Sequence, residues 1–225
     1  MSGDPSNEPV WLVTGASRGI GAAIAARAHN QGCRVVVVAR GEEALRTADK
    51  MGAGALGIQA DVSDVAAAEG AIEKTVATFG RIDVVVNNAG VHRGGKVERL
   101  SPEDWQTVLN VNLTGALNII RAAKPHMGSG ASIINIGAVV GFRGFPGDVA
   151  YASSKAGLSG MTNALAIEMA KQEQAGNDVT LSVDVGVQFF AAERLRRGIS
   201  ETMPLEHNSV QAALMQNDEL RAHVS

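Results

Sequence analysis

The stretch V-W-L-V-T-G-A-S-R-G-I-G, from Val10 to Gly21, decides the fold of this chain. It begins as an apolar run of strand type, continues as a loop with glycines spaced G-x-x-x-G-x-G, and leads into an Ala-rich helical segment ending near Ala28. A strand, a glycine loop and a helix in this order point free backbone N–H groups and the positive end of a helix dipole at a phosphate. Gly15 would allow the tight turn, Gly19 the close approach of a pyrophosphate, and Gly21 the close packing of helix on strand. Glycines also cluster in ordinary turns, so the flanking strand and helix are what favour a nucleotide site.

Strand-like and helical stretches alternate from this loop to about residue 185. The pattern predicts further strands at residues 34–39, 55–60, 81–86, 131–136 and 179–185, and helices at 42–51, 64–79, 101–124 and 151–171. Ser63 or Asp64 would cap the second of these helices, and Ser101, followed by Pro102, the third. This alternation predicts an α/β fold, a Rossmann-type doubly wound parallel sheet with helices on both faces.

The predicted domain organisation is simple. Residues 1–225 are expected to form a single NAD(P)-binding Rossmann domain, because no linker or change of composition divides the chain before about residue 185. Within it, residues 1–9 are expected to be a polar N-terminal tail and residues 186–225 a divergent lid and C-terminal segment.

Composition excludes several classes of function. The net charge is −3 and there is no basic cluster, which argues against binding to nucleic acid or to an anionic membrane surface. No apolar run approaches the roughly 20 residues that span a bilayer, and we expect no signal peptide. The single cysteine, Cys33, cannot form an internal disulfide and suits a reducing cytoplasm, where we expect the protein to act. The five histidines show no ligand spacing, so no metal site is predicted.

In a doubly wound sheet, ligands bind beyond the carboxyl ends of the strands, where the strand order reverses. The residues expected there, and hence the candidate cofactor-binding residues, are Gly15, Ser17, Arg18, Gly19, Ile20, Arg40, Asp61, Val62, Asn88, Ala89 and Gly90. An acidic residue at the end of the second strand usually holds the ribose hydroxyls of NAD(H), whereas an arginine there favours the 2′-phosphate of NADP(H). Arg40 occupies that position and Arg18 lies in the loop, so NADP(H) is preferred and NAD(H) is the alternative. The other interpretation is that Arg40 is a solvated surface arginine.

Tyr151 and Lys155, in the segment Y-A-S-S-K, would share one face of a helix. A phenol titrates near pH 10, but a neighbouring ammonium and an oxidised nicotinamide would both favour the phenolate. The pair could therefore protonate a carbonyl oxygen as hydride reaches the carbon. Taken alone, a Tyr-x-x-x-Lys pair is more often a coincidence on the surface.

The sequence resembles the classical short-chain dehydrogenase/reductase family. The family's T-G-x-x-x-G-x-G matches residues 14–21, its N-N-A-G matches 87–90, its Y-x-x-x-K matches 151–155 and its helix asparagine matches Asn112. The resemblance implies an NAD(P)-dependent oxidoreductase, usually a tetramer. It also implies that Tyr151 donates the proton and contacts the cofactor, that Lys155 binds the nicotinamide ribose and lowers the tyrosine pKa, and that Asn112 holds a relay water. The loop I-G-A-V-V-G, residues 136–141, looks most like the 3-oxoacyl-acyl-carrier-protein and acetoacetyl-CoA reductases.

The chain departs from the family pattern in three places. The family's catalytic serine, which contacts the substrate carbonyl beside the tyrosine, is here Ala138, and loss of one such donor typically costs about 2.7–4 kcal/mol. Ser132 is too far along the strand to substitute, and Ser153 and Ser154 are expected to serve helix packing. After the sixth strand the family has a Pro-Gly turn followed by a threonine; here Gly186 can stand for the turn glycine, the proline is missing, and no residue is assigned to the threonine. The closing strand of the family is also absent, which puts the lid, the sheet edge and the tetramer in doubt.

Two hypotheses follow from the sequence. The first is an NADPH-dependent carbonyl reductase of a 3-oxoacyl thioester or similar small ketone, in which Ala138 and Tyr151 contact the substrate. The second is a cofactor-binding protein with little or no catalysis, acting as a sensor or interaction partner. A structural subunit without nucleotide binding is disfavoured because the whole phosphate loop is present. The long helices at 102–124 and 151–171 predict at least a homodimer, through small residues such as Ala152, Ala156, Gly157 and Gly160.

Overall fold

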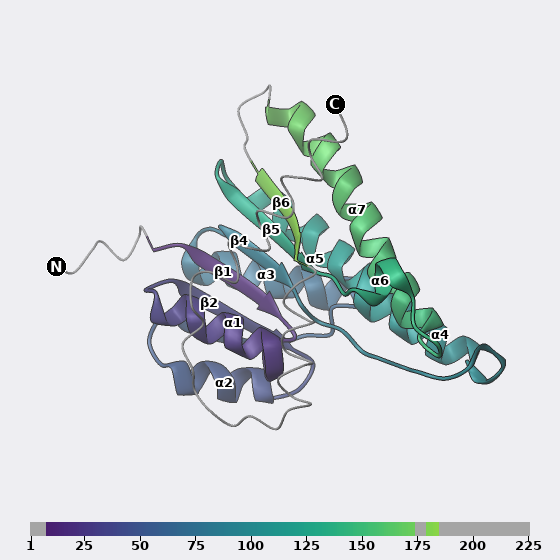
Figure 1. Ribbon diagram of the computed structural model, residues 1–225. Helices are drawn as coiled ribbons and strands as arrows, with labels where there is room; N and C mark the ends of the chain where they lie inside the picture. Colours follow the sequence, from purple (N-terminus) through teal and green to yellow (C-terminus); the bar gives the residue numbers. More distant parts are fainter. Residues whose placement is uncertain (1–7, 174–178, 185–225) are drawn as a thin grey trace. The chain divides into compact units, whose positions relative to one another are not determined.

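The computed structural model describes residues 8–173 and 179–184, which build one parallel sheet with helices on both faces (Figure 1). The strands are β1 (Val10–Thr14), β2 (Arg34–Ala39), β3 (Ala55–Gln59), β4 (Val84–Asn87), β5 (Ala131–Ile136) and β6 (Val179–Asp184). Their order in the sheet is β3-β2-β1-β4-β5-β6, and every neighbouring pair is parallel. The order reverses between β1 and β4, so the predicted doubly wound Rossmann sheet is confirmed. The predicted lid and C-terminal segment, 186–225, and residues 1–7 of the predicted tail lie outside the described residues.

The helices alternate with the strands along the chain. They are α1 (Gly19–Asn30), α2 (Glu43–Met51), α3 (Val65–Phe79), α4 (Pro102–Leu109), α5 (Gly115–Ala123), α6 (Val140–Arg143) and α7 (Val149–Glu173). A π-helical segment, Asn110–Thr114, joins α4 to α5, and short 3₁₀ turns lie at Val97–Arg99 and Lys124–His126. The predicted single helix over 101–124 is therefore divided. None of the helices in the described part of the chain is both long and apolar enough to cross a membrane.

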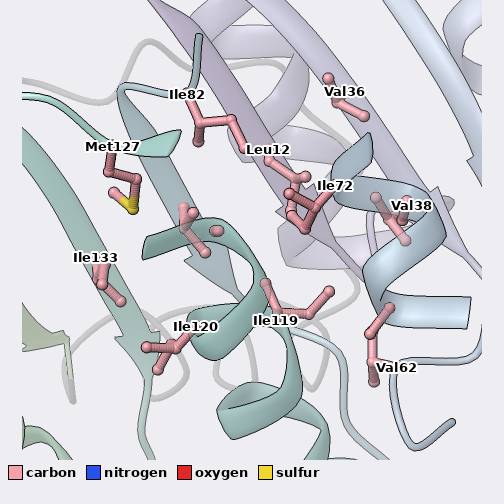
Figure 2. Packing of buried hydrophobic residues seen from close by; sticks show 14 of the residues in the cluster. Leu12, Val36, Val38, Val62, Ile72, Ile82, Ile119, Ile120, Met127 and Ile133 are labelled. Atoms are coloured by element: carbon pink, nitrogen blue, oxygen red, sulfur yellow. The ribbon is translucent and has the colours of Figure 1, made fainter. Parts of the chain in front are cut away.

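Two buried clusters, one on each face, hold the sheet between its helices. Val36 and Val38 of β2 join a cluster with residues of α3 and α5, whereas Val35 and Val37 join a cluster with alanines of α1 and α2. Successive side chains of a strand point to opposite faces, so an unbroken valine run is buried on both. Figure 2 shows the first cluster, in which Leu12, Val36 and Val38 of the strands face Ile72 of α3 and Ile119 of α5.

The helix caps agree with those predicted from the sequence, whereas the start of one strand differs from the prediction. Asp64 caps α3 by accepting a hydrogen bond from the Ala67 N–H (2.8 Å), so the structure chooses it over Ser63. Ser101 caps α4 in the same way. The fourth strand was predicted from residue 81 but β4 begins at Val84. Just before it, the Asp83 carboxylate accepts from the Val10 N–H (2.8 Å).

Candidate active site

The glycine loop is fastened to the segment that follows β4. The Thr14 hydroxyl oxygen accepts hydrogen bonds from the N–H groups of Asn88 and Ala89, both at 3.0 Å. The Asn88 amide donates to the carbonyl oxygens of Thr14 (2.9 Å) and Gly15 (3.2 Å). Thr14 and Asn88 therefore fix the loop against the carboxyl end of β4, at the point where the strand order reverses.

The loop glycines leave an open cradle at the start of α1. Gly15 and Gly19 have φ values of +63° and +59°, which side chains rarely allow. A Cβ at Gly15 would meet the Ala89 backbone, whereas nothing lies within 4 Å of a Cβ position at Gly19. The space above Gly19 is free for a ligand at the helix N-terminus, as the sequence predicts. Gly21 differs from its predicted role, because its close neighbours are Gly15 and Ala16 of the loop and the Asn88 side chain, not the strand.

A cavity of about 560 Å³ opens beside this loop. It is lined by every candidate cofactor-binding residue except Tyr151 and Lys155. Residues that the sequence argument did not single out also line it: Val38, Ala39, Gly41, Glu43, Ala60, Val91 and Val111. The cavity combines a phosphate-type cradle with a cleft between strand ends, so the residues present fit an extended dinucleotide.

Both cationic and anionic side chains line this cavity. Arg40 and Asp61 lie across it, with Nη1 and Oδ2 4.0 Å apart, and Asp61 also accepts from the backbone and hydroxyl of Ser63. The Glu43 carboxylate folds back into the space that a Cβ at Gly41 would need. Sequence reasoning considered only the end of β2 and so missed Glu43, which comes into the cavity from the first residue of α2.

Asn112 lies in the middle of the π-helical segment and is almost fully buried. Its Oδ1 accepts from the Val91 N–H (2.7 Å), and its Nδ2 donates to the Val91 carbonyl (3.0 Å) and to the Ser154 hydroxyl (3.0 Å). Ser154 in turn donates to the Tyr151 carbonyl (2.7 Å). Asn112 therefore connects the segment that follows β4 to the first turns of α7.

Lys155 is the largest fully buried side chain of the described residues, at 2% exposure. Its Nζ donates to the Ile136 carbonyl at the end of β5 (2.7 Å) and lies 5.6 Å from the centroid of the Tyr151 ring. Burial lowers the pKa of Lys155 from 10.5 to about 8, because a desolvated ammonium is disfavoured. The structure thus brings the predicted Tyr151, Lys155 and Asn112 together at the carboxyl end of the sheet.

Ala138 follows β5 and is buried, at 5% exposure. Ser154 offers no replacement hydroxyl, because it already donates to Tyr151 and accepts from Asn112. Ser132 pairs with Val84 at the far end of the strands, as expected from its position. The Ala138 methyl group therefore occupies the position of the family's serine hydroxyl, just after β5 and on the same edge of the sheet as Tyr151.

His92 and Asp148 form a pair beside Tyr151 that sequence reasoning did not find. The His92 Nε2 lies 2.7 Å from Asp148 Oδ1, and the His92 ring stands edge-to-face with Tyr151, with centroids 5.1 Å apart. The two residues are 56 positions apart in the chain, and neither lies in a recognisable motif, so only the fold reveals the pair.

Comparison with known proteins places this site in a family. The sequence profile described as short chain dehydrogenase matches residues 9–182. The chain belongs to the short-chain dehydrogenase family. The match covers the glycine loop, Asn112, Tyr151 and Lys155, so this dehydrogenase carries the family's motifs in one continuous region.

Relatives of this dehydrogenase include several reductases. It is 39% identical to the 3-oxoacyl-[acyl-carrier-protein] reductase of Escherichia coli, over 85% of this chain and 77% of that one. It is 40% identical to a (2S)-[(R)-hydroxy(phenyl)methyl]succinyl-CoA dehydrogenase subunit of Thauera aromatica, over 72% of this chain and 67% of that one.

Solved structures agree in fold with this dehydrogenase. A short-chain dehydrogenase of Burkholderia cenocepacia in complex with NADP matches with a TM-score of 0.73 and 33% identity, over 80% of this chain and 74% of that one. A 3-ketoacyl-(acyl-carrier-protein) reductase of Brucella melitensis with NADH matches with a TM-score of 0.70 and 32% identity, over 74% and 72% of the two chains.

Chemically, the site combines a phosphate cradle with a phenol and a buried amine. Within residues 8–173 and 179–184, no three histidine, cysteine or acidic side chains come together as metal ligands. A phenol beside an amine is an acid/base pair, and the open cleft next to it can take a hydride carrier.

Proposed function

We propose that this chain is an NADPH-dependent carbonyl reductase that acts on a 3-oxoacyl thioester or a similar small ketone. The observation that carries the proposal is the buried Lys155 amine held 5.6 Å from the Tyr151 ring, at the sheet edge where the cavity opens. Burying a lysine is costly, so an amine kept there beside a phenol is typical of a catalytic site. The 3-oxoacyl reductases of Escherichia coli and Brucella melitensis among the similar proteins support this substrate class.

NADP(H) is the cofactor that the cavity fits best, with NAD(H) as the alternative. Gly15, Ser17, Gly19 and Ile20 would hold the pyrophosphate with backbone N–H groups, and Arg18 and Arg40 would hold the 2′-phosphate. Asp61 and Val62 would contact the adenine, and Asn88, Ala89 and Gly90 the ribose and nicotinamide side of the cleft. Bound there, the cofactor supplies the hydride for the carbonyl carbon.

The chain's own residues would manage the proton. Tyr151 would donate its phenolic proton to the carbonyl oxygen as the carbon is reduced. Lys155 would hold the nicotinamide ribose with an ammonium that also favours the phenolate left behind. Asn112 would hold a water on the path that returns a proton to the site, as the family resemblance implies.

Ala138 takes the place of the family's serine in this proposal. A serine hydroxyl there would donate to the substrate oxygen, and the methyl group cannot. One lost donor of this kind typically lowers turnover on the order of a hundred- to a thousand-fold. We therefore expect Ala138→Ser to raise turnover at least tenfold.

The test is NADPH oxidation with acetoacetyl-CoA, measured for this chain and for Ala138→Ser side by side. The control variant is Tyr151→Phe in the Ala138→Ser background, which removes one hydroxyl and should abolish the gain. NADPH binding, followed by fluorescence, checks that each variant is folded. Equal turnover with alanine and serine would contradict the role assigned to position 138.

The second candidate is a cofactor-binding protein without useful catalysis. The buried methyl of Ala138 favours it, because the site lacks one of the donors that stabilise charge on the substrate oxygen. Both candidates predict NADPH binding. Only the reductase predicts that a ketone accelerates NADPH oxidation, in this chain or in Ala138→Ser.

We further propose that the protein works in the cytoplasm as a homo-oligomer, a dimer or tetramer built on its two long helical stretches. The single cysteine and the absence of an apolar run long enough to span a bilayer support the location. Neither nucleic acid nor a membrane is a proposed partner, because the chain is acidic overall and has no basic cluster.

A further inference from the structure

The His92–Asp148 pair is built as a positioned group. Asp148 is only 17% exposed, and its carbonyl oxygen accepts from the Ala152 N–H (2.7 Å), which fixes it at the start of α7. Its carboxylate lies one helical turn before Tyr151 and 2.7 Å from His92 Nε2. A carboxylate only accepts hydrogen bonds, so Nε2 must carry the proton that they share. Asp148 therefore fixes the orientation of the imidazole.

A second contact holds the two loops that carry this pair. The Gly95 N–H donates to the Gly147 carbonyl (2.8 Å), so the loop after β4 and the loop before α7 are joined at two points. The Arg93 side chain also donates to the His92 carbonyl (3.3 Å). The imidazole is therefore held beside the Tyr151 ring at 5.1 Å between centroids and 76° between planes, while just over half of its side chain stays exposed.

The reaction proposed above needs a donor that the chain lacks at its usual place. Negative charge develops on the carbonyl oxygen, and donors aimed at that oxygen are usually the largest stabilising contribution. Tyr151 supplies one, and Ala138 supplies none. The ring of His92 packs edge-to-face against that of Tyr151.

We propose that His92, oriented by Asp148, donates a hydrogen bond to the substrate carbonyl oxygen in place of the missing serine hydroxyl. This inference rests on the proposed reductase function. The ketone carbon gains a hydride, the C=O π electrons move to oxygen, and the oxygen takes the phenolic proton of Tyr151. His92 keeps its own proton and contributes only the hydrogen bond.

The donor state of His92 is its protonated form. Nε2–H is engaged by Asp148, so Nδ1 donates only when the ring carries both protons. Two titratable groups face the His92 ring, Asp148 and Tyr151, and Lys155 lies behind the tyrosine. Arg93, the next residue in the chain, pairs instead with Asp104 (3.4 Å).

The first experiment is a double-mutant cycle on acetoacetyl-CoA reduction with NADPH. His92→Ala is expected to lower kcat/KM at least tenfold while the NADPH dissociation constant stays within about twofold. The fold gain from Ala138→Ser should be at least ten times larger in the His92→Ala background than in the unaltered chain. An unchanged kcat/KM in His92→Ala, or the same fold gain in both backgrounds, overturns the inference.

Two further variants separate donation from mere packing. His92→Gln keeps an amide N–H donor at this position, so it should keep kcat/KM within about fivefold of the unaltered chain. Asp148→Ala should lower kcat with little change in NADPH binding, because the His92 ring loses the acceptor that fixes its orientation. If His92→Gln is as inactive as His92→Ala, His92 acts through packing alone and the inference fails.

A binding measurement tests the inference without turnover. The chain is loaded with NADP⁺, which cannot reduce acetoacetyl-CoA, and the dissociation constant of acetoacetyl-CoA is measured by titration. His92→Ala should raise this constant at least fivefold, and Ala138→Ser should restore it. Binding that is equal in both chains overturns this inference alone. An unaltered chain that binds NADP⁺ but no acetoacetyl-CoA overturns both this inference and the proposed substrate class.

Discussion

At the scale of single residues, Lys155 combines two opposed effects. Its amine is buried, which destabilises the charged form, and it is held by one carbonyl, that of Ile136. Burial lowers its pKa to about 8, whereas a lysine in the unfolded chain has a pKa of 10.5. The fold therefore accepts a thermodynamic cost at neutral pH in order to keep an amine beside Tyr151.

The sign of this effect gives a stability prediction. Between about pH 8 and 10.5 the unfolded chain holds a proton on Lys155 that the folded chain has released, so folding becomes more favourable as pH rises through this window. The gain is at most about 3 kcal/mol, at roughly 1.4 kcal/mol for each pH unit. Lys155→Met should lack it, so the unfolding free energy of the unaltered chain should rise relative to that of Lys155→Met between pH 8 and 10.

Urea denaturation at several pH values measures this difference. The control is Lys50→Met, which removes an ammonium from the exposed side of α2 and corrects for the change in net charge. Parallel stability curves for the unaltered chain and Lys155→Met would show that the amine is not desolvated in the folded protein.

At the scale of elements, the π-helical segment is the part that connects the site. The extra residue in this turn lets the Asn112 side chain reach Val91, while α4 and α5 continue on either side. Such single π turns are often found at functional sites. Asn112 thereby fixes the segment that follows β4 relative to the start of α7.

Removing this side chain should destabilise the whole fold. Asn112→Ala leaves the Val91 N–H and carbonyl without their partner, and each buried unsatisfied group costs about 1–3 kcal/mol. We expect a loss of about 2 kcal/mol or more in unfolding free energy, measured by urea denaturation. Asn110→Ala is the matched control, because it removes only an exposed bond from Gln106 and should cost less than about 1 kcal/mol. Equal losses in both variants would contradict the connecting role of Asn112.

The sequence predicts those elements whose cause is local. The glycine loop, the valine run of β2 and the Ser101 cap each depend on neighbouring residues, and the structure has all three. The π turn was missed because the bond that accompanies it, from the Val91 N–H to Asn112, joins residues twenty-one positions apart. The four-residue helix α6 is too short to show a periodicity. Glu43, His92 and Asp148 were missed for the same reason as the π turn, since the fold alone brings them to the site.

At the scale of the whole molecule, assembly is the property to test. Gly157 was expected to face a second helix, but a Cβ there would meet Leu113 of the same chain, so this glycine serves internal packing. Gly160 has open space around it, and Ile167 of α7 is 63% exposed. A large exposed apolar side chain two turns from an open glycine on the same helix is consistent with the proposed contact between copies.

Light scattering on the full chain should give the mass of at least a dimer. Ile167→Glu should shift the mass towards that of one chain, because a carboxylate would be buried in the contact. Leu45→Glu, on the exposed side of α2, is the control and should leave the mass unchanged. A monomer for the unaltered chain would refute the homo-oligomer.

The mixed charges of the cavity have a consequence for kinetics. Arg18 and Arg40 line it together with Glu43 and Asp61, so the cationic and anionic side chains balance. A highly charged nucleotide approaching this mouth meets little net field, and electrostatic attraction is what makes association rates sensitive to ionic strength. Capture of the cofactor should therefore proceed at nearly the same rate in dilute buffer and in concentrated salt.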